Sequence, residues 1–278
     1  MNLRELRALL DARGLAPRSR HGQNFLVDSA LLAAIPGDAG VCAGERVLEV
    51  GPGAGALTAE LLAAGARILA VEIDAGLAAL LRERFAAELA AGTLELLQAD
   101  VLASGERFAP RVEEWWGEGT PPRVVANLPY AISGPFLGRL PGRPLLGACL
   151  LLQREVAEKA AGREAGPLGV RLALGFEVRL GRRVPREVFW PRPEVLSAFL
   201  HLIPRSERPT AAEDADLRRL LQEAFGQRRK RVLARMRKTA PAAAAALEAA
   251  GVGEDDRPEH VAVAAWWAAV RAHRIARS

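Results

Sequence analysis

The chain has 278 residues, half of them hydrophobic, enough for one large domain or for a domain of about 200 residues with a small appendage. It contains no run of 18 or more uncharged apolar residues and its N-terminus is charged, so we expect no membrane span and no signal peptide. Cys42 and Cys149 form no CxxC motif, and with four scattered histidines they predict a protein without a metal site in a reducing cytoplasm. The net charge of +5 indicates little by itself, because an arginine-rich composition has other causes than a charged partner.

The chain opens with two helical segments, and a regular alternation of strands and helices follows. The first helix is expected over residues 2–13, ending at Gly14, and a short one over 29–35, stopped by Pro36. The alternating segments are expected strands at 46–51, 67–74, 94–100, 123–129 and 147–153, with helices at 55–65 and 75–91. Strands and helices at this spacing predict a parallel, doubly wound sheet.

The pattern changes around and after the last of these strands. "RFAPRVEEWWGEGTPP" (107–122) is expected as a surface loop with at most one helical turn, with Trp115 and Trp116 as packing anchors. Residues 158–169 are glycine-rich and predict a loop, and closing strands follow at 177–185 and 196–204. Because 204–210 is polar and proline-bearing, we expect an α/β domain over 1–204 and a small all-α domain over 205–278.

A glycine loop follows the first strand in "VLEVGPGAGALT" (47–58). Gly51, Gly53 and Gly55 let backbone N–H groups approach a ligand closely, and the next helix adds positive potential at its N-terminus. Glu72 falls 21 residues after Gly51, as a dinucleotide fold would require. The loop alone therefore fits both NAD and S-adenosylmethionine.

Polar residues end several successive strands, in "VEID", "LQAD" and "NLPY". Glu72, Asp100 and Asn127 would meet at one edge of the sheet, where open α/β sheets bind ligands. A carboxylate at position 72 can accept hydrogen bonds from both hydroxyls of a ribose, and one at position 100 can accept from an adenine amino group. The alternatives are a helix N-cap for Asp100, and for Asn127 a tight turn with Tyr130 packed on the core.

A basic run interrupts the C-terminal helical region in "GQRRKRVLARMRK" (226–238). Arg228, Arg229, Lys230 and Arg231 are typical of a surface that contacts nucleic acid. The alternative is a solvated helix face.

Six motifs in order resemble one family, the ribosomal RNA adenine dimethyltransferases, and within it the small-subunit (16S) members. They are "HGQNFLVD", "VLEVGPGAGALT", "VEID", "LQAD", "NLPY" and "VFWPRPEVLSAFLHL", and "FGQRRKRV" continues the similarity into the tail. The resemblance implies a Rossmann-like class I methyltransferase fold with an antiparallel closing strand and a C-terminal RNA-binding domain. It also implies methyl transfer from S-adenosylmethionine to N6 of two adjacent adenines near the 3′ end of 16S rRNA. The longer "EEWWGEGTPP" loop departs from the family pattern.

The resemblance also implies roles for single residues. The cofactor would contact Asn24, Leu26, Gly51, Gly53, Glu72, Asp100 and Asn127, with Glu49 orienting its amino group. The reaction would depend on Asn127, the backbone carbonyl of Leu128 or Pro129, and the rings of Tyr130 and Phe189. The basic run at 228–231 would bind RNA, and no metal is implied.

Other functions remain open at this point. A large-subunit RNA methylase, a small-molecule methyltransferase, an RNA-binding assembly factor and an NAD-dependent dehydrogenase each share some of these features. The proline-rich segment and the basic tail favour the small-subunit enzyme, whose partner is 16S rRNA within precursors of the small ribosomal subunit. We expect a cytoplasmic monomer.

Overall fold

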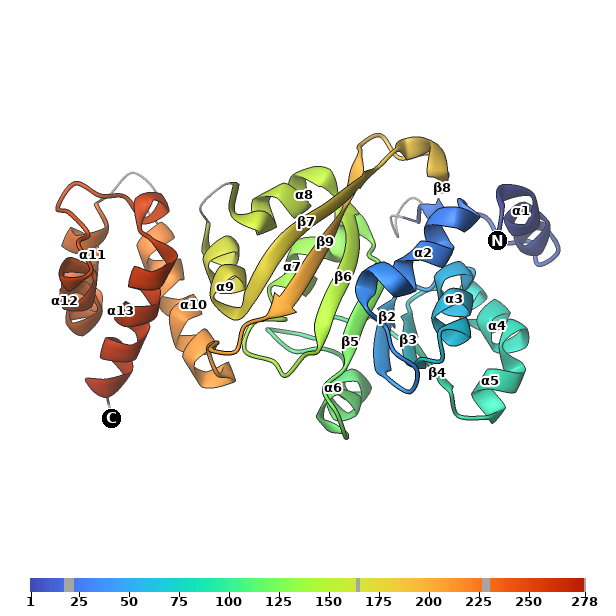
Figure 1. The fold of residues 1–278 in the computed structure, drawn as a ribbon, viewed down its shortest axis with the longest axis horizontal. Coiled ribbons are helices and arrows are strands. Elements are labelled where there is room, and N and C mark those ends of the chain that lie inside the picture. The colour runs from blue at the N-terminus through green and yellow to red at the C-terminus, as the bar shows by residue number, and fades with distance from the viewer. Residues whose placement is uncertain (18–22, 164–165, 227–230, 278) are drawn as a thin grey trace. The chain divides into compact units, whose positions relative to one another are not determined.

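A seven-stranded sheet in the order β4-β3-β2-β5-β6-β9-β7 is formed by the residues that the computed structural model describes, 1–17, 23–163, 166–226 and 231–277 (Figure 1). Its strands are β2 (Arg46–Val50), β3 (Arg67–Glu72), β4 (Leu94–Gln98), β5 (Arg123–Asn127), β6 (Gly147–Gln153), β7 (Phe176–Val184) and β9 (Ser197–Pro204). Strands β2 to β6 pair in parallel, and β9 pairs with β6 in the antiparallel direction. The predicted doubly wound sheet with an antiparallel closing strand is confirmed.

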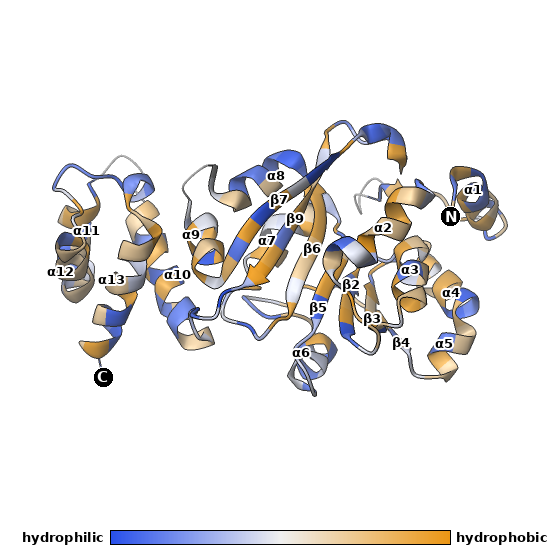
Figure 2. Ribbon diagram, viewed as in Figure 1, coloured by the Kyte–Doolittle hydropathy of each residue, from blue (hydrophilic) through white to orange (hydrophobic). Residues whose placement is uncertain are grey.

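The central strands are apolar runs that are buried on both faces. Val124, Val125 and Ala126 of β5 are at most 2% exposed, and β6 is buried from Gly147 to Leu152. Such runs are typical of parallel strands with helices on both sides. The edge strand β7 is mostly hydrophilic and β9 mostly hydrophobic (Figure 2), as expected when charged residues protect an unpaired edge.

The prediction that the second helix stops at Pro36 is wrong, because the proline lies inside helix α2 (Ser29–Ala39). Gly40 ends it instead, in a left-handed conformation with φ of 67°. Val41 N–H donates to the Pro36 carbonyl at 2.9 Å across this end. A helix closed in this way requires a glycine-like residue, and Pro36 only removes one internal donor.

The helix expected over 75–91 is two helices, α4 (Ala75–Arg84) and α5 (Ala86–Ala90). They are separated at Phe85, whose φ of −114° and ψ of 33° are not helical. The Phe85 ring lies where a Cβ on Gly55 would be, so it packs against the glycine loop. The break therefore places an aromatic ring behind the loop.

The expected loop over 107–122 contains a two-turn helix, α6 (Pro110–Gly117), which is a third correction. Trp115 and Trp116 are 7% and 4% exposed, so their expected role as packing anchors is confirmed. Trp116 Nε1 donates to the Pro144 carbonyl at 2.7 Å, and the Arg46 guanidinium lies 4.0 Å from the centre of the Trp115 ring. Pro110 stands in the first turn of α6, where proline is well tolerated, and Gly117 is its last residue, so neither interrupts the helix.

Residues 158–169 are also more helical than expected, and the remaining elements are short. The segment lies within α8 (Arg154–Glu158), η3 (Lys159–Arg163) and the start of α9 (Pro167–Gly175), apart from Gly166, which precedes α9, and 164–165, which lie outside the described residues. The others before the C-terminal helices are α1 (Leu3–Asp11), β1 (Phe25–Leu26), α3 (Ala56–Ala63), η2 (Tyr130–Ile132), α7 (Ser133–Leu137), η4 (Arg186–Val188) and β8 (Phe189–Trp190). Strands β1 and β8 pair in a small antiparallel sheet.

The chain divides into two compact units. One contains residues 1–139, 144–157 and 179–202, and the other 140–143, 158–178 and 203–278. The second has its own core of apolar side chains such as Leu221, Met236 and Trp266, drawn from α9 and the last helices. These are α10 (Ala211–Phe225), α11 (Val232–Thr239), α12 (Pro241–Ala249), η5 (Pro258–His260) and α13 (Val263–Ile275). The predicted domain boundary at 204 stays a prediction, since residues 158–178 group with the helical unit. No helix in the described part of the chain is both long and apolar enough to span a membrane.

The helical unit buries one ion pair, which gives a stability prediction. Arg171 on α9 contacts Asp214 on α10 through two hydrogen bonds of 2.9 and 2.6 Å, and both side chains are 8% exposed. Arg171→Met leaves a buried, unpaired carboxylate, so the free energy of unfolding should fall by about 3–5 kcal/mol. Adding Asp214→Leu should recover most of that loss, as followed by urea denaturation.

The control is Arg13→Met, which breaks an exposed pair with Glu83 and should cost about 1 kcal/mol or less. Equal losses for Arg171→Met and Arg13→Met would contradict the prediction.

Candidate active site

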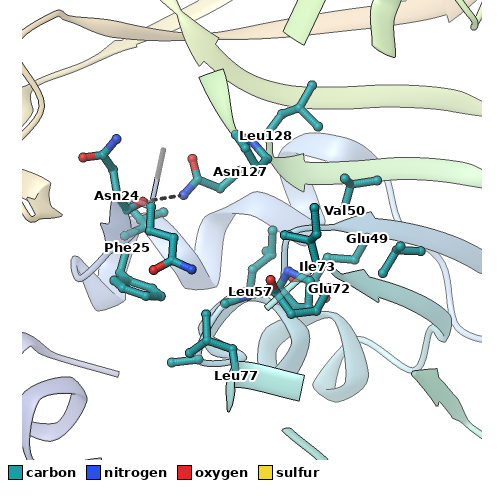
Figure 3. Close-up of a pocket in the computed structure, with 18 of the residues that line it drawn as sticks. Asn24, Phe25, Glu49, Val50, Leu57, Glu72, Ile73, Leu77, Asn127 and Leu128 are labelled. Atoms are coloured by element: carbon teal, nitrogen blue, oxygen red, sulfur yellow. Dashed lines mark hydrogen bonds between the residues drawn. The ribbon is translucent and has the colours of Figure 1, made fainter. Parts of the chain in front are cut away.

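One cavity opens where β2, β3, β4 and β5 end (Figure 3). The carboxyl ends of parallel strands meet at the same edge of a sheet, so side chains far apart in sequence face the same space. The predicted site residues in its wall are Asn24, Leu26, Gly51, Gly53, Glu72, Asp100, Asn127, Leu128, Pro129 and Tyr130. The structure therefore brings these residues together, while their individual roles stay predictions.

The glycine loop forms one side of the cavity because its conformation excludes side chains. Gly51, Gly53 and Gly55 have φ values of 68°, 62° and 80°, which residues with a Cβ rarely adopt. A Cβ on Gly53 would lie 2.9 Å from Cε1 of Phe25, whose ring covers the loop. The loop can thus present backbone to a ligand at close range.

Glu72 ends β3 with its carboxylate held by the backbone. Its Oε2 accepts from Gly53 N at 3.0 Å and its Oε1 from Asp74 N at 2.9 Å. Burial raises the pKa of this carboxyl group, and these backbone hydrogen bonds oppose the rise. Each oxygen has a further lone pair with which to accept from a ligand hydroxyl.

Glu49 lies beneath the loop and is 1% exposed. Burial raises its pKa to about 8, although the Thr58 hydroxyl donates to its Oε2 at 2.7 Å and favours the charged form. The nearby Glu72 carboxylate raises it further. Glu49 is therefore ready to ionise when a cationic group binds above it.

Asp100 follows β4 as an exposed residue, not as a helix N-cap. Its Oδ1 accepts from Leu102 N at 2.9 Å, which closes a turn within the chain. Its other oxygen can face a ligand in the cavity. Among the described residues, no group of three or more His, Cys, Asp or Glu is placed to hold a metal ion.

Asn127 is fixed by a contact distant in sequence, whereas the alternative of a tight turn would have it bond its own backbone. Its Nδ2 donates to the Asn24 carbonyl at 3.0 Å, across 103 residues of chain (Figure 3). One of the two Nδ2 N–H groups is committed in this way, which fixes the orientation of the amide and leaves its carbonyl oxygen available to a ligand as an acceptor.

The two candidate backbone acceptors after Asn127 differ in their surroundings. The Pro129 carbonyl already accepts from Ile132 N at 3.1 Å and from Ser133 Oγ at 3.3 Å. Leu128 is anchored to β6, since its N–H donates to the Leu151 carbonyl at 3.1 Å. Of the two, the Leu128 carbonyl is therefore the better acceptor for a ligand.

Tyr130 lines the cavity and is only partly buried, so its ring is not packed in the core as the tight-turn alternative required. Its hydroxyl lies 2.7 Å from Ser197 Oγ, and either atom can donate. Burial raises the pKa of the phenol further above neutral pH, so the hydroxyl stays protonated and can donate.

Two other predicted groups lie elsewhere. Phe189 is 4% exposed, occupies β8 opposite Leu26 of β1, and is not in the cavity wall formed by the described residues. Residues 228–230 of the basic run lie outside the described residues. Arg231 is described, and its Nη2 contacts Asp255 Oδ1 at 2.7 Å on an exposed surface.

Sequence reasoning missed part of the cavity wall. Met1 and Leu6 from the N-terminal helix segment line it, as does the Phe25 ring that packs on Gly53. The amphipathic pattern of residues 2–13 signals that the helix buries one face. It does not say against which element, because that partner is set by tertiary packing.

The comparisons with known proteins agree with this geometry. A family model described as ribosomal RNA adenine dimethylase matches residues 14–272. The chain belongs to this family.

Curated relatives cover nearly the whole chain. The chain is 39% identical over 275 residues to the ribosomal RNA small subunit methyltransferase A of Anaeromyxobacter sp. (strain K), covering 95% of this chain and 96% of that one. It is 41% identical to the protein of the same name from Leifsonia xyli, covering 94% of each.

Solved structures show the same fold. A 23S rRNA methyltransferase, ErmE, has a TM-score of 0.67 at 27% identity, covering 90% of this chain and all of that one. A dimethyladenosine transferase from Plasmodium falciparum also has a TM-score of 0.67, at 22% identity, covering 88% of this chain and 95% of that one. These likenesses confirm the class I methyltransferase fold.

The raised pKa of Glu49 gives a pH prediction. The pKa of Glu49 is about 8 in the folded chain and about 4.5 in the unfolded chain, so between these pH values the folded chain binds the proton more strongly. The free energy of unfolding should therefore fall as the pH rises from 4.5 to 8. Glu49→Gln carries no titrating group, so denaturation across this range should give a flatter profile than the wild type.

Glu60→Gln is the control, because it changes a partly exposed carboxylate on α3. A Glu49→Gln profile as steep as the wild type would show that this carboxyl group does not contribute.

Proposed function

We propose that this chain transfers methyl groups from S-adenosylmethionine to N6 of two adjacent adenines in a hairpin near the 3′ end of 16S rRNA, within precursors of the small ribosomal subunit. Family membership and the names of relatives at 39–41% identity support this. The observation that carries it is the Asn127 amide, held by Asn24 so that a carbonyl acceptor remains for a ligand at the cavity.

A large-subunit rRNA adenine methyltransferase is the alternative, supported by the 27% identity to the 23S enzyme. The higher identity to relatives named for the small subunit favours the first reading. A small-molecule methyltransferase, an NAD-dependent dehydrogenase and a non-catalytic assembly factor are not favoured by a family match that spans residues 14–272.

The hydrogen-bond acceptors in the cavity wall match the hydroxyl and amino groups of S-adenosylmethionine. Glu72 provides carboxylate oxygens for ribose hydroxyls, Asp100 provides one for the adenine amino group, and the loop at Gly51 and Gly53 admits the methionine part. Asn24 and Leu26 border the same space from β1 and the residue before it. When bound, this cofactor supplies an electrophilic methyl group on a positively charged sulfur.

The target nitrogen needs activation, because the lone pair of an adenine amino group is delocalised into the ring. Two acceptors aimed at its two N–H bonds pull the nitrogen toward a tetrahedral shape and free that lone pair. Asn127 Oδ1 and the Leu128 carbonyl are these acceptors. Their hydrogen bonds strengthen as charge develops on the nitrogen, so they stabilise the transition state more than the ground state.

Tyr130 holds the base before the reaction. An enzyme that acts on a base takes it out of the stack and packs it against an aromatic ring. Tyr130 provides that ring in the cavity wall. Phe189 was expected over the opposite face, and its burial against β1 means that this role requires the segment to move.

The remaining requirements are electrostatic. A nitrogen that gains a methyl group and a positive charge releases its proton readily, so no strong general base is needed. The basic run from Arg228 to Arg231 would contact RNA phosphates. The protein is also proposed to act as a monomer, in the cytoplasm and without a metal.

Cofactor binding is tested at Glu72. Glu72→Gln removes the charge that strengthens hydrogen bonds to the ribose, so S-adenosylmethionine should bind about 1.5–3 kcal/mol more weakly in calorimetric titration. Glu95→Gln on β4 is the control, since its carboxylate pairs with Arg111 outside the cavity wall. Unchanged affinity in folded Glu72→Gln would remove Glu72 from the cofactor site.

Catalysis is tested at Asn127. Asn127→Ala removes an acceptor that acts mainly in the transition state, so single-turnover methylation of under-methylated small subunits should slow about 10²–10³-fold. The affinity for the subunit should change little. Gln98→Ala, which removes an exposed amide at the end of β4, is the matched control. Methylation by Asn127→Ala at the wild-type rate would contradict the mechanism.

A further inference from the structure

One buried hydroxyl beside the cavity has no role in the chemistry above. Ser197 is 0% exposed, and its Oγ lies 2.7 Å from the Tyr130 hydroxyl. A hydroxyl is rarely buried without a hydrogen-bond partner, because moving it out of water without one costs free energy. Here the partner is the one tyrosine of the chain.

The position of Ser197 follows from strand direction. The parallel strands reach the cavity with their last residues, but β9 runs the other way and pairs Ser197 with Gln153, the last residue of β6. The first residue of β9 is therefore the one at the ligand edge of the sheet. Ser197 is thus set on a strand of the main sheet, next to β6, which is buried almost throughout.

Tyr130 lies on a much shorter element than Ser197 does. It begins the three-residue turn η2, directly after Pro129, and its ring stands in the cavity wall. A ring on so short an element can rotate about its side-chain bonds unless something restrains its far end. The hydroxyl, at the end of the ring away from the backbone, is the atom that Ser197 holds.

We propose that Ser197 is a positioning residue that fixes the Tyr130 ring in the orientation that stacks on the target adenine. This inference rests on the proposed function and adds a specific residue to it. With the ring held before RNA arrives, less conformational freedom is lost when the base is captured. The closing strand β9 therefore contributes to substrate recognition although it supplies no atom that contacts the base.

The alternative is that the pair only stabilises the fold. Both readings predict that Ser197→Ala and Tyr130→Phe lower the melting temperature. Only positioning predicts that the two changes are coupled in methylation, and that Ser197→Ala has no further effect when the ring is absent.

The experiment is a double-mutant cycle on single-turnover methylation of under-methylated small ribosomal subunits, at saturating subunits and S-adenosylmethionine. Ser197→Ala and Tyr130→Phe should each slow methylation about three- to tenfold, as expected for the loss of one hydrogen bond. The double variant should be no slower than either single variant. The affinities for S-adenosylmethionine and for the subunit, measured in parallel, should match the wild type and show that each variant is folded.

A second comparison uses Tyr130→Ala, in which adding Ser197→Ala should leave the rate unchanged. Wild-type rates for both single variants would overturn the inference, and so would effects that multiply in the double variant. A wild-type chain that leaves the subunits unmethylated would overturn the proposed function and this inference with it. Methylation by the wild type with no effect of either variant would overturn the inference alone.

Discussion

The hydrogen bond from Asn127 Nδ2 to the Asn24 carbonyl, 3.0 Å long, is the contact on which the rest of the site depends. A free amide could present either its donor or its acceptor to a ligand, and the two have opposite effects on an amino group. The bond to Asn24 uses one of the two N–H groups and fixes the orientation of the amide, so that its carbonyl oxygen is available to a ligand. It also ties the segment before β1 to the end of β5, so the part of the chain that would border the cofactor is joined directly to the part that would activate the base.

The surroundings of this contact are built from the central sheet outward. The carboxyl ends of parallel strands bring Glu72, Asp100 and Asn127 to one edge, and a glycine loop that excludes side chains leaves room for a ligand there. Two aromatic rings pack on the glycine loop, Phe25 against Gly53 and Phe85 against Gly55. Most of the predicted site residues lie at or next to strand ends, which suits a reaction that works by positioning rather than by a strong acid or base.

The sheet and the convergence of polar strand ends could be predicted from the sequence, because hydrophobic runs and strand direction determine them. What could not be predicted depends on partners distant in the chain. The residue that holds Asn127 lies 103 positions away, and the burial of Phe189 against β1 follows from a two-residue pairing with no signal of its own. Local rules also failed where packing overrode them, as at Pro36, which lies within a helix that a glycine ends.

The most direct test of this account is to incubate the chain with labelled S-adenosylmethionine and under-methylated small ribosomal subunits and then to map the labelled nucleotides. The account predicts label on N6 of two adjacent adenines in a hairpin near the 3′ end of 16S rRNA. Label on another atom or nucleotide of the subunit would contradict it, as would label that appears only in 23S rRNA when large subunits are supplied.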